Sequence, residues 1–166
     1  MTAVEDPEAL STKACFVCSK HRQGQDVEGG ILYRDDTLYA GHCHLLGRDD
    51  ILLGWLIIEP LRHVAELGDL TDGEAAALGT LASRLARGLQ QSEGAEHVYS
   101  FVFGDGLAAP HLHLHLIPRY PGTPREYWGQ RVPEWPDAPR GGVEAMTETI
   151  QRLRLHLSDP RADGGV

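Results

Sequence analysis

The chain has 166 residues and a formal net charge of −9, from 15 Lys and Arg against 24 Asp and Glu, and its length and 42% hydrophobic content predict one domain with an ordinary core. The acidic balance argues against sequence-independent binding to nucleic acid or to an anionic membrane surface, since both require clustered Lys and Arg. No apolar run has the length of a membrane span, and residues 1–10 are acidic where a signal peptide is basic, so we expect a cytoplasmic protein.

The N-terminal part of the chain predicts a turn followed by a hairpin. We expect the first dozen residues to be loose and Cys15–Cys18 to form a tight turn that leads into a Gly-rich link, 24–30. Strand-like runs follow at 31–33 and 37–46. Because Asp35-Asp36 lies between these two runs, the segment indicates a β-hairpin.

A buried strand and an amphipathic helix are predicted next. The apolar run 51–58 ends before Pro60, and its length and β-branched content favour a buried strand. Thr71 and Glu74 then form a capping-box pattern, which predicts the start of a helix that continues to Gly94. The apolar positions of this helix, at steps of three and four, are Leu78, Leu81, Leu85 and Leu89.

The second half of the chain predicts two more strands, an irregular arm and a last helix. Residues 97–103 alternate in polarity, and residues 110–118 alternate more strictly than any other segment. Six of the ten prolines fall within 118–139, which predicts an irregular arm held in place by Trp128 and Trp135. The last amphipathic helix is indicated by Met146, Ile150, Leu153 and Leu157.

Strands placed before and after one main helix indicate an α+β domain. The sheet is expected to be mostly antiparallel, with about five strands, one covering helix and a C-terminal helix. The sequence shows no internal repeat and no second core. We therefore expect residues 1–166 to form a single domain, with a core at about 13–120 and with the arm and the C-terminal helix at 121–157.

The three cysteines are an odd number, which does not suit a disulfide framework. Cys15 and Cys18 have C-x-x-C spacing, which in a reducing compartment favours metal or redox chemistry. On the residues alone, the pair fits a zinc knuckle, a redox pair or two small buried hydrophobic residues. Cys43 is expected in the core.

The sharpest motif is the alternating run His111–Ile117, which contains three histidines. In a strand, His111, His113 and His115 point to one face at a spacing of about 7 Å, while the leucines between them enter the core. A single histidine on a half-exposed strand is usually only a solvated polar residue. Three in strict alternation indicate function, because imidazole titrates near neutral pH and serves as a base, a nucleophile or a ligand.

This run resembles the signature of the histidine triad (HIT) superfamily, His-φ-His-φ-His-φ-φ with φ apolar, at every position of His111–Ile117. The segment Gly54–His63 also resembles the family strand that ends in Pro-x-x-His. The resemblance covers roughly residues 15–120 and implies a HIT-like fold.

The resemblance also implies a nucleotidyl hydrolase or transferase. His113, the middle histidine, is then the nucleophile that attacks the α-phosphorus and carries the nucleotidyl group, and His115 contacts the phosphate or the leaving group. A neutral imidazole suits this role, because its reference pKa of about 6.5 leaves it largely unprotonated at pH 7. The transferases of the superfamily usually have glutamine at the position of His115, so the histidine there resembles the hydrolase branch.

A second set of residues is predicted to bind structural zinc. Cys15 and Cys18 form a knuckle, and His63 and His111 from separate segments complete a tetrahedral Cys2His2 set. Many bacterial triad proteins, and their uridylyltransferase relatives, bind zinc with the same set. The metal is expected to hold the N-terminal turn against the histidine strand without acting as a Lewis acid.

The expected substrate contacts depart from the family pattern. The chain has no asparagine, and Leu107–Pro110 replaces the phosphate-binding Gln-Ser pair of many members. Trp55 stands where some members have a further histidine. The candidate substrate-binding residues each have a structural alternative, such as an exposed edge position, a turn or a solvated strand end. These candidates are His42, His44, Gly104, Gly106 and Arg119.

Three functions are carried forward from the sequence. The first is a hydrolase that cleaves a nucleoside phosphoramidate, mixed anhydride or dinucleoside polyphosphate through a nucleotidyl-histidine intermediate, with a nucleotidyltransferase as a variant. The second is a non-catalytic, zinc-stabilised nucleotide-binding module. The third is a catalytic metal centre on the three triad histidines, although it lacks the carboxylate of a 2-His-1-carboxylate site. Family resemblance also implies a homodimer.

Overall fold

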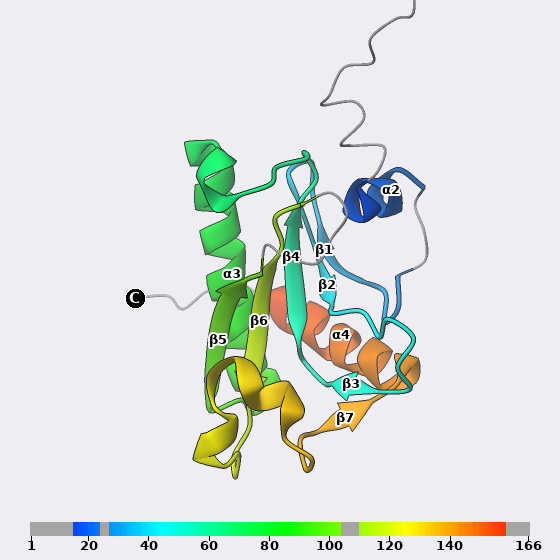
Figure 1. The fold of residues 1–166 in the computed structure, drawn as a ribbon, viewed down its shortest axis with the longest axis vertical. Helices are drawn as coiled ribbons and strands as arrows, with labels where there is room; N and C mark the ends of the chain where they lie inside the picture. Colours follow the sequence, from blue (N-terminus) through cyan, green and yellow to red (C-terminus); the bar gives the residue numbers. More distant parts are fainter. Residues whose placement is uncertain (1–14, 24–26, 104–109, 159–166) are drawn as a thin grey trace, which may run out of the picture.

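A computed structural model describes residues 15–23, 27–103 and 110–158 (Figure 1). Its centre is a five-stranded antiparallel sheet with strand order β1-β2-β4-β6-β5. The strands are β1 (Ile31–Arg34), β2 (Leu38–His42), β4 (Leu56–Pro60), β5 (His97–Val102) and β6 (Leu114–Arg119). The predicted α+β class and antiparallel sheet are confirmed. The residues expected to be loose at the N-terminus lie outside the described part of the chain.

Strands β1 and β2 form the predicted hairpin around Asp35. Asp35 Oδ1 accepts hydrogen bonds from the backbone N–H groups of Thr37 and Leu38, both at 2.7 Å. These side-chain bonds fix the turn. Strand β2 ends at His42, earlier than expected, and the chain then bends through Leu46 and Gly47, which both have positive φ.

The apolar run 51–58, expected as one strand, forms two. These are β3 (Ile51–Leu52) and β4, and β3 pairs with β7 (Arg140–Gly141) in a separate small sheet. The break falls at Gly54, whose φ of +79° is unfavourable for any residue with a Cβ. A Cβ there would also lie 2.7 Å from the hydroxyl of Tyr120. The glycine therefore ends one strand and redirects the chain into the next.

Two helices cover one face of the sheet (Figure 1). After a short 3-10 turn, η1 (Leu67–Asp69), helix α3 (Asp72–Ser92) begins at the predicted capping box, in which Thr71 and Glu74 exchange hydrogen bonds. Helix α4 (Val143–Ser158) packs beside it. The shared core includes Leu78, Leu81, Leu85 and Leu89 of α3, Ile150 and Leu153 of α4, and Leu56, Ile58 and Leu116 of the sheet.

The opposite face of the sheet carries the chemistry. Because side chains alternate along a strand, Glu59 and His115 point to the face opposite the core residues Ile58 and Leu116. Helix α2 (Phe16–Gln23) lies over part of this face (Figure 1). The tight turn expected at Cys15–Cys18 is therefore the first turn of a helix, in which the Ser19 N–H donates to the Cys15 carbonyl at 3.0 Å.

The proline-rich arm is irregular, as predicted. It contains two 3-10 segments, η2 (Arg125–Tyr127) and η3 (Gly129–Glu134), and it adds Val132 to the main core. The Trp128 indole N–H donates to the Thr123 carbonyl, and Trp135 packs against the core. Among the described helices, none combines the length and apolarity needed to cross a bilayer.

Candidate functional site

The triad keeps the predicted alternation at its leucines, because Leu112 and Leu116 enter the main core and Leu114 packs against it. Regular pairing of β6 begins only at Leu114, so His111 and His113 precede the strand. The Leu112 N–H donates instead to the Val64 carbonyl at 2.8 Å. His111 contacts Cys18 of α2. The rings of His113 and His115 lie next to each other, with their centroids 4.8 Å apart.

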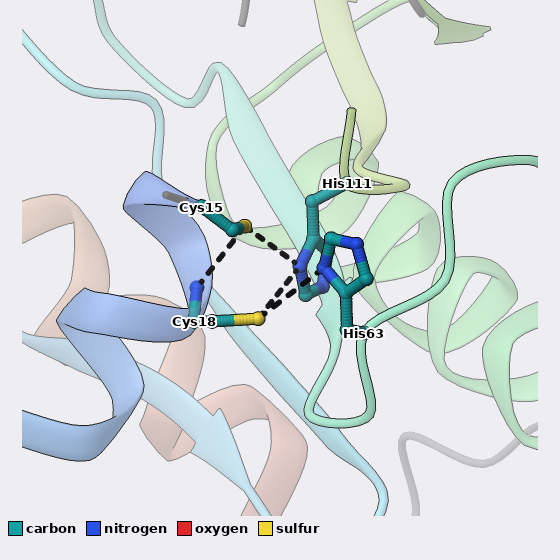
Figure 2. A group of neighbouring side chains, drawn as sticks. All are labelled: Cys15, Cys18, His63 and His111. Atoms are coloured by element: carbon teal, nitrogen blue, oxygen red, sulfur yellow. Dashed lines mark hydrogen bonds between the residues drawn. The ribbon is translucent and has the colours of Figure 1, made fainter. Parts of the chain in front are cut away.

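His111 joins Cys15, Cys18 and His63 in one compact cluster (Figure 2). The four candidate ligand atoms lie within 4.8 Å of one another. Cys15 Sγ is 3.3 Å from His111 Nδ1, and Cys18 Sγ is 3.4 Å from the Nδ1 atoms of both histidines. The structure thus brings together all four residues of the predicted zinc set.

The protonation of His111 suits a metal ligand. Its Nε2 lies 2.9 Å from the Pro60 carbonyl, which only accepts, so Nε2 carries the proton and Nδ1 presents a lone pair to the sulfur atoms. Burial lowers the pKa of His111 to about 4. Burial and the hydrogen bond with Cys15 raise the pKa of the Cys18 thiol to about 11.

His113 and His115 line a separate open cavity. It is a small cavity, with a volume of about 120 Å³. His113 Nδ1 lies 2.8 Å from the His111 carbonyl oxygen. Because a carbonyl only accepts, His113 donates from Nδ1 and its Nε2 carries the lone pair. The backbone therefore fixes His113 in the tautomer that a nucleophilic imidazole needs.

His115 is enclosed by aromatic side chains. Its ring centroid lies 5.7 Å from that of Trp55 and 4.9 Å from that of Phe103. The Trp55 indole N–H donates to His115 Nδ1 at 2.9 Å. Burial lowers the pKa of His115 to about 4. His115 is therefore neutral at pH 7.

A buried ionic cluster forms another part of the cavity wall. The Glu59 carboxylate, 2% exposed, lies 2.5 Å from Lys20 Nζ and 3.1 Å from His21 Nε2. Burial by itself would raise the pKa of Glu59, but the hydrogen bond from His21 and the charge of Lys20 outweigh it and lower the pKa to about 2. Lys20 also donates to His44 Nε2 at 3.4 Å.

His42 and His44, both expected at the substrate, lie in different surroundings. His44 is in the cavity wall, where its ring meets that of Phe16 edge-on. His42 is 1% exposed, its Nδ1 lies 3.0 Å from the Cys43 carbonyl, and its Nε2 accepts the Gly54 N–H. His42 therefore does not line the described cavity, and both of its ring nitrogens contact the backbone.

The other candidate substrate residues do not line the described cavity. The Arg119 guanidinium lies over the Trp128 ring at 4.0 Å, donates to the Tyr99 hydroxyl and approaches Glu96. It pairs in register with His97 at the far end of β6. Gly104 and Gly106 lie outside the described residues.

Several residues of the cavity wall were missed from the sequence. They are Phe16, Val17, Cys43, Leu46, Ile57 and Glu59. For Glu59 a signal existed, because a carboxylate inside the apolar stretch Leu56–Pro60 must be buried and paired. For the apolar residues no signal existed, because the sequence does not distinguish an apolar residue that lines a cavity from one in the core.

The family model of the HIT domain matches residues 46–122, which include Pro60-x-x-His63 and the whole triad. Residues 46–122 are therefore a HIT domain. The structural neighbours of this HIT protein agree with that assignment at the level of the fold.

Two solved structures illustrate the shared HIT fold. A zinc-bound histidine triad family protein from Mycobacterium smegmatis has a TM-score of 0.61 at 19% identity, over 87% of this chain and 93% of the other. A hypothetical histidine triad nucleotide-binding protein from Sulfolobus tokodaii has a TM-score of 0.63 at 18% identity, over 85% and 90% of the two chains.

Among curated proteins, the HIT protein is similar to an AP-4-A phosphorylase from Mycobacterium tuberculosis. The two are 32% identical over 107 residues, which are 60% of this chain and 51% of the relative. A second M. tuberculosis strain gives the same match. The chain thus spans about half the length of the curated relatives that it matches.

Proposed function

We propose that this HIT protein is a nucleotidyl hydrolase that works through a covalent intermediate on His113. The observation that carries the proposal is the 2.8 Å contact between His113 Nδ1 and the His111 carbonyl, in a histidine that lines the cavity. In the neutral imidazole this contact puts the proton on Nδ1 and the lone pair on Nε2. The apolar wall residues Phe16, Val17 and Ile57 suit a flat, largely apolar group such as a nucleobase.

The proposed reaction has two steps. In the first, the Nε2 lone pair of His113 forms a bond to the α-phosphorus, the bond from phosphorus to the leaving group breaks, and its electron pair departs with that group. The new imidazolium keeps its Nδ1 proton in the bond to the His111 carbonyl. In the second, water attacks phosphorus, loses a proton to solvent, and releases the nucleoside monophosphate as the pair returns to Nε2.

His115 and His44 are the proposed partners of the phosphate or the leaving group, since both line the same cavity as His113. Two alternatives remain open to experiment. Transfer of the nucleotidyl group to an acceptor such as phosphate instead of water is suggested by the name of the curated relative. A nucleotide-binding module without turnover is suggested by the missing asparagine. A catalytic metal centre is disfavoured, because His111 lies with the cysteines and not with His113.

A substrate screen tests this function directly. Adenosine and guanosine phosphoramidates, mixed anhydrides and dinucleoside polyphosphates are incubated with the protein, with and without phosphate, and the products are identified. A nucleoside monophosphate formed from one of these classes supports the hydrolase. A nucleoside diphosphate formed only with phosphate present supports transfer, and binding without any product supports the non-catalytic module.

We also propose that Cys15, Cys18, His63 and His111 bind one structural zinc ion. The residues fit it, because two thiols and two imidazoles converge within 4.8 Å and Nε2 of His111 is already bonded to the backbone. The four ligands would complete a closed tetrahedral site with no open position for a substrate. Zinc would therefore link the segments that carry the ligands and would not act as a Lewis acid. The ligands come from α2, from the segment after β4 and from the segment before β6. Their cross-link would hold α2 as one wall of the cavity.

A homodimer formed through the β5 edge is the third proposal. Strand β5 is at the end of the sheet, with Val102 38% exposed, and an uncovered edge strand favours pairing with a second copy. We expect light scattering to give about twice the mass of one chain. Val102→Lys should shift the protein toward monomer, since charge on an edge strand opposes pairing. Leu155→Lys on α4, also at an exposed apolar residue, is the control. A wild-type mass of one chain at all concentrations contradicts the dimer.

A further inference from the structure

Trp55 makes a hydrogen bond that determines where His115 carries its proton. The indole Nε1–H lies 2.9 Å from His115 Nδ1. Indole is a donor only, so Nδ1 must accept and cannot itself bear hydrogen. A neutral imidazole has one ring proton, which in His115 is then on Nε2. His115 is 6% exposed, and water has little access with which to replace this bond.

The two histidines of the cavity are thus held in opposite tautomers. The His111 carbonyl keeps the proton of His113 on Nδ1, and Trp55 keeps that of His115 on Nε2. His113 presents a lone pair, and His115 presents an N–H donor. Protonating His115 on Nδ1 would place two N–H groups against each other, which costs the hydrogen bond with Trp55.

We propose that Trp55 is a positioning residue that holds His115 as a neutral Nε2–H donor, and that the site therefore takes substrates whose leaving group departs without a proton. Such groups are phosphate, nucleotide or other stable anions, in contrast to amines. This inference rests on the proposed function, because it concerns the leaving group of the reaction on His113.

The chemistry of the leaving group gives the reason. When the bond to a phosphate oxygen breaks, that oxygen keeps the electron pair as a stable anion, and the His115 N–H can stabilise it by hydrogen bonding. When the bond to an amine breaks, the nitrogen needs a proton. A neutral imidazole is a poor source of that proton compared with an imidazolium ion, whose pKa lies near neutral pH.

The other titratable groups of the described cavity do not supply this proton. His113 is the nucleophile, and Glu59 is ionised beside Lys20 and His21. Burial and the charge of Lys20 lower the pKa of His44, which keeps it neutral as well. The described wall therefore offers hydrogen-bond donors and no acid of suitable strength for an amine.

The tautomer is tested first on the wild-type protein, without substrate. Long-range nitrogen–proton correlation NMR distinguishes a protonated ring nitrogen from an unprotonated one. We expect His115 to show a proton on Nε2 and none on Nδ1 from pH 8 down to about pH 5. A spectrum with the proton on Nδ1, or an average of the two tautomers, overturns the inference whether or not the protein has activity.

The leaving-group preference is tested with two AMP derivatives that differ only in the leaving group. AMP fluoridate releases fluoride, which needs no proton, and AMP phosphoramidate releases ammonia, which does. We expect kcat/KM for the fluoridate to exceed that for the phosphoramidate by about 100-fold or more, the usual size of a general-acid effect. An equal or reversed preference overturns the inference. If neither compound nor any polyphosphate gives turnover or an adduct, the proposed function is contradicted instead. The NMR result on the tautomer of His115 does not depend on that outcome.

A variant then connects the preference to the indole N–H. Trp55→Phe keeps an aromatic ring and removes the donor, which should raise the pKa of His115, reduce the fluoridate preference at least about tenfold and move the acid limb of the pH profile upward. Trp128→Phe removes an indole hydrogen bond in the arm and should leave the pKa of His115, the fluoridate preference and the pH profile unchanged. A folded Trp55→Phe protein with unchanged preference and pH profile contradicts the role of Trp55. The wild-type NMR and substrate comparison decide the matter if this variant does not fold.

Discussion

Replacing His113 with alanine is expected to reduce turnover by roughly three orders of magnitude or more, because the variant lacks the proposed nucleophile. Zinc content and thermal stability should stay close to those of the wild type, since His113 is outside the Cys2His2 cluster. Steady-state kinetics on the best substrate of the screen, with zinc analysis of the same preparation, measure both.

Two matched variants complete this experiment. His156→Ala removes a histidine from α4, on the other side of the sheet, and should leave kcat/KM unchanged. His115→Ala should keep the fold and slow the reaction less than His113→Ala, because it removes a hydrogen-bond donor and not the nucleophile. Full activity in His113→Ala, or loss of zinc from it, would refute the assignment of the nucleophile.

Replacing Cys15 with alanine is expected to cause the largest loss of stability. If zinc is bound at a thousandfold above its dissociation constant, losing it removes about 4 kcal/mol from the free energy of unfolding. For a chain of this size, such a loss lowers the melting temperature by roughly 10 °C. His111→Ala should lose zinc and stability in the same way. His113→Ala, only two residues further along the chain, should keep both.

Cys43→Ala is the matched control for this loss. Cys43 is also buried, and it lies outside the four-residue cluster, so its replacement removes only packing. Elemental analysis should find one zinc ion per chain in the wild type and in Cys43→Ala, and none in Cys15→Ala. Equal melting temperatures for the two cysteine variants, or an unchanged wild-type melting curve after complete chelation, would contradict a structural zinc ion.

Much of the fold could be predicted because local patterns and tertiary packing agree. Thr71 and Glu74 form the capping box that the sequence indicates, and the leucines that follow them fill the core. Asp35 caps the hairpin turn as its position suggests. In these segments the favourable local conformation also buries the apolar face.

The differences arise where a contact distant in sequence decides the conformation. The bend at Gly54 depends on Tyr120 and His42, which approach from other strands. Strand pairing does not extend to His111, since the Leu112 N–H donates to the Val64 carbonyl instead of to a strand partner. Neither contact has a signal in the local sequence. The turn at Cys15 became a helix because a C-x-x-C spacing fits the first turn of α2 as well as an open knuckle.

The candidate site was predictable in its chemistry and not in its surroundings. The four metal-ligand candidates could be chosen from residue type and family resemblance, and the structure brings them together. His42 was placed with His44 because alternation puts residues two apart on one face. The chain leaves β2 after His42, so this alternation does not extend to His44. The role of Trp55 required the distance to His115, which no spacing in the sequence encodes.

The most direct test of the account is a search for the nucleotidyl group on His113. The wild-type protein is mixed with a substrate labelled at the α-phosphorus, quenched in alkali within one turnover, and digested for mass spectrometry. We expect an acid-labile nucleotidyl adduct on His113 that forms and decays at rates compatible with kcat and is absent from His113→Ala. Turnover without an adduct at any time, or an adduct on another residue, would contradict this expectation.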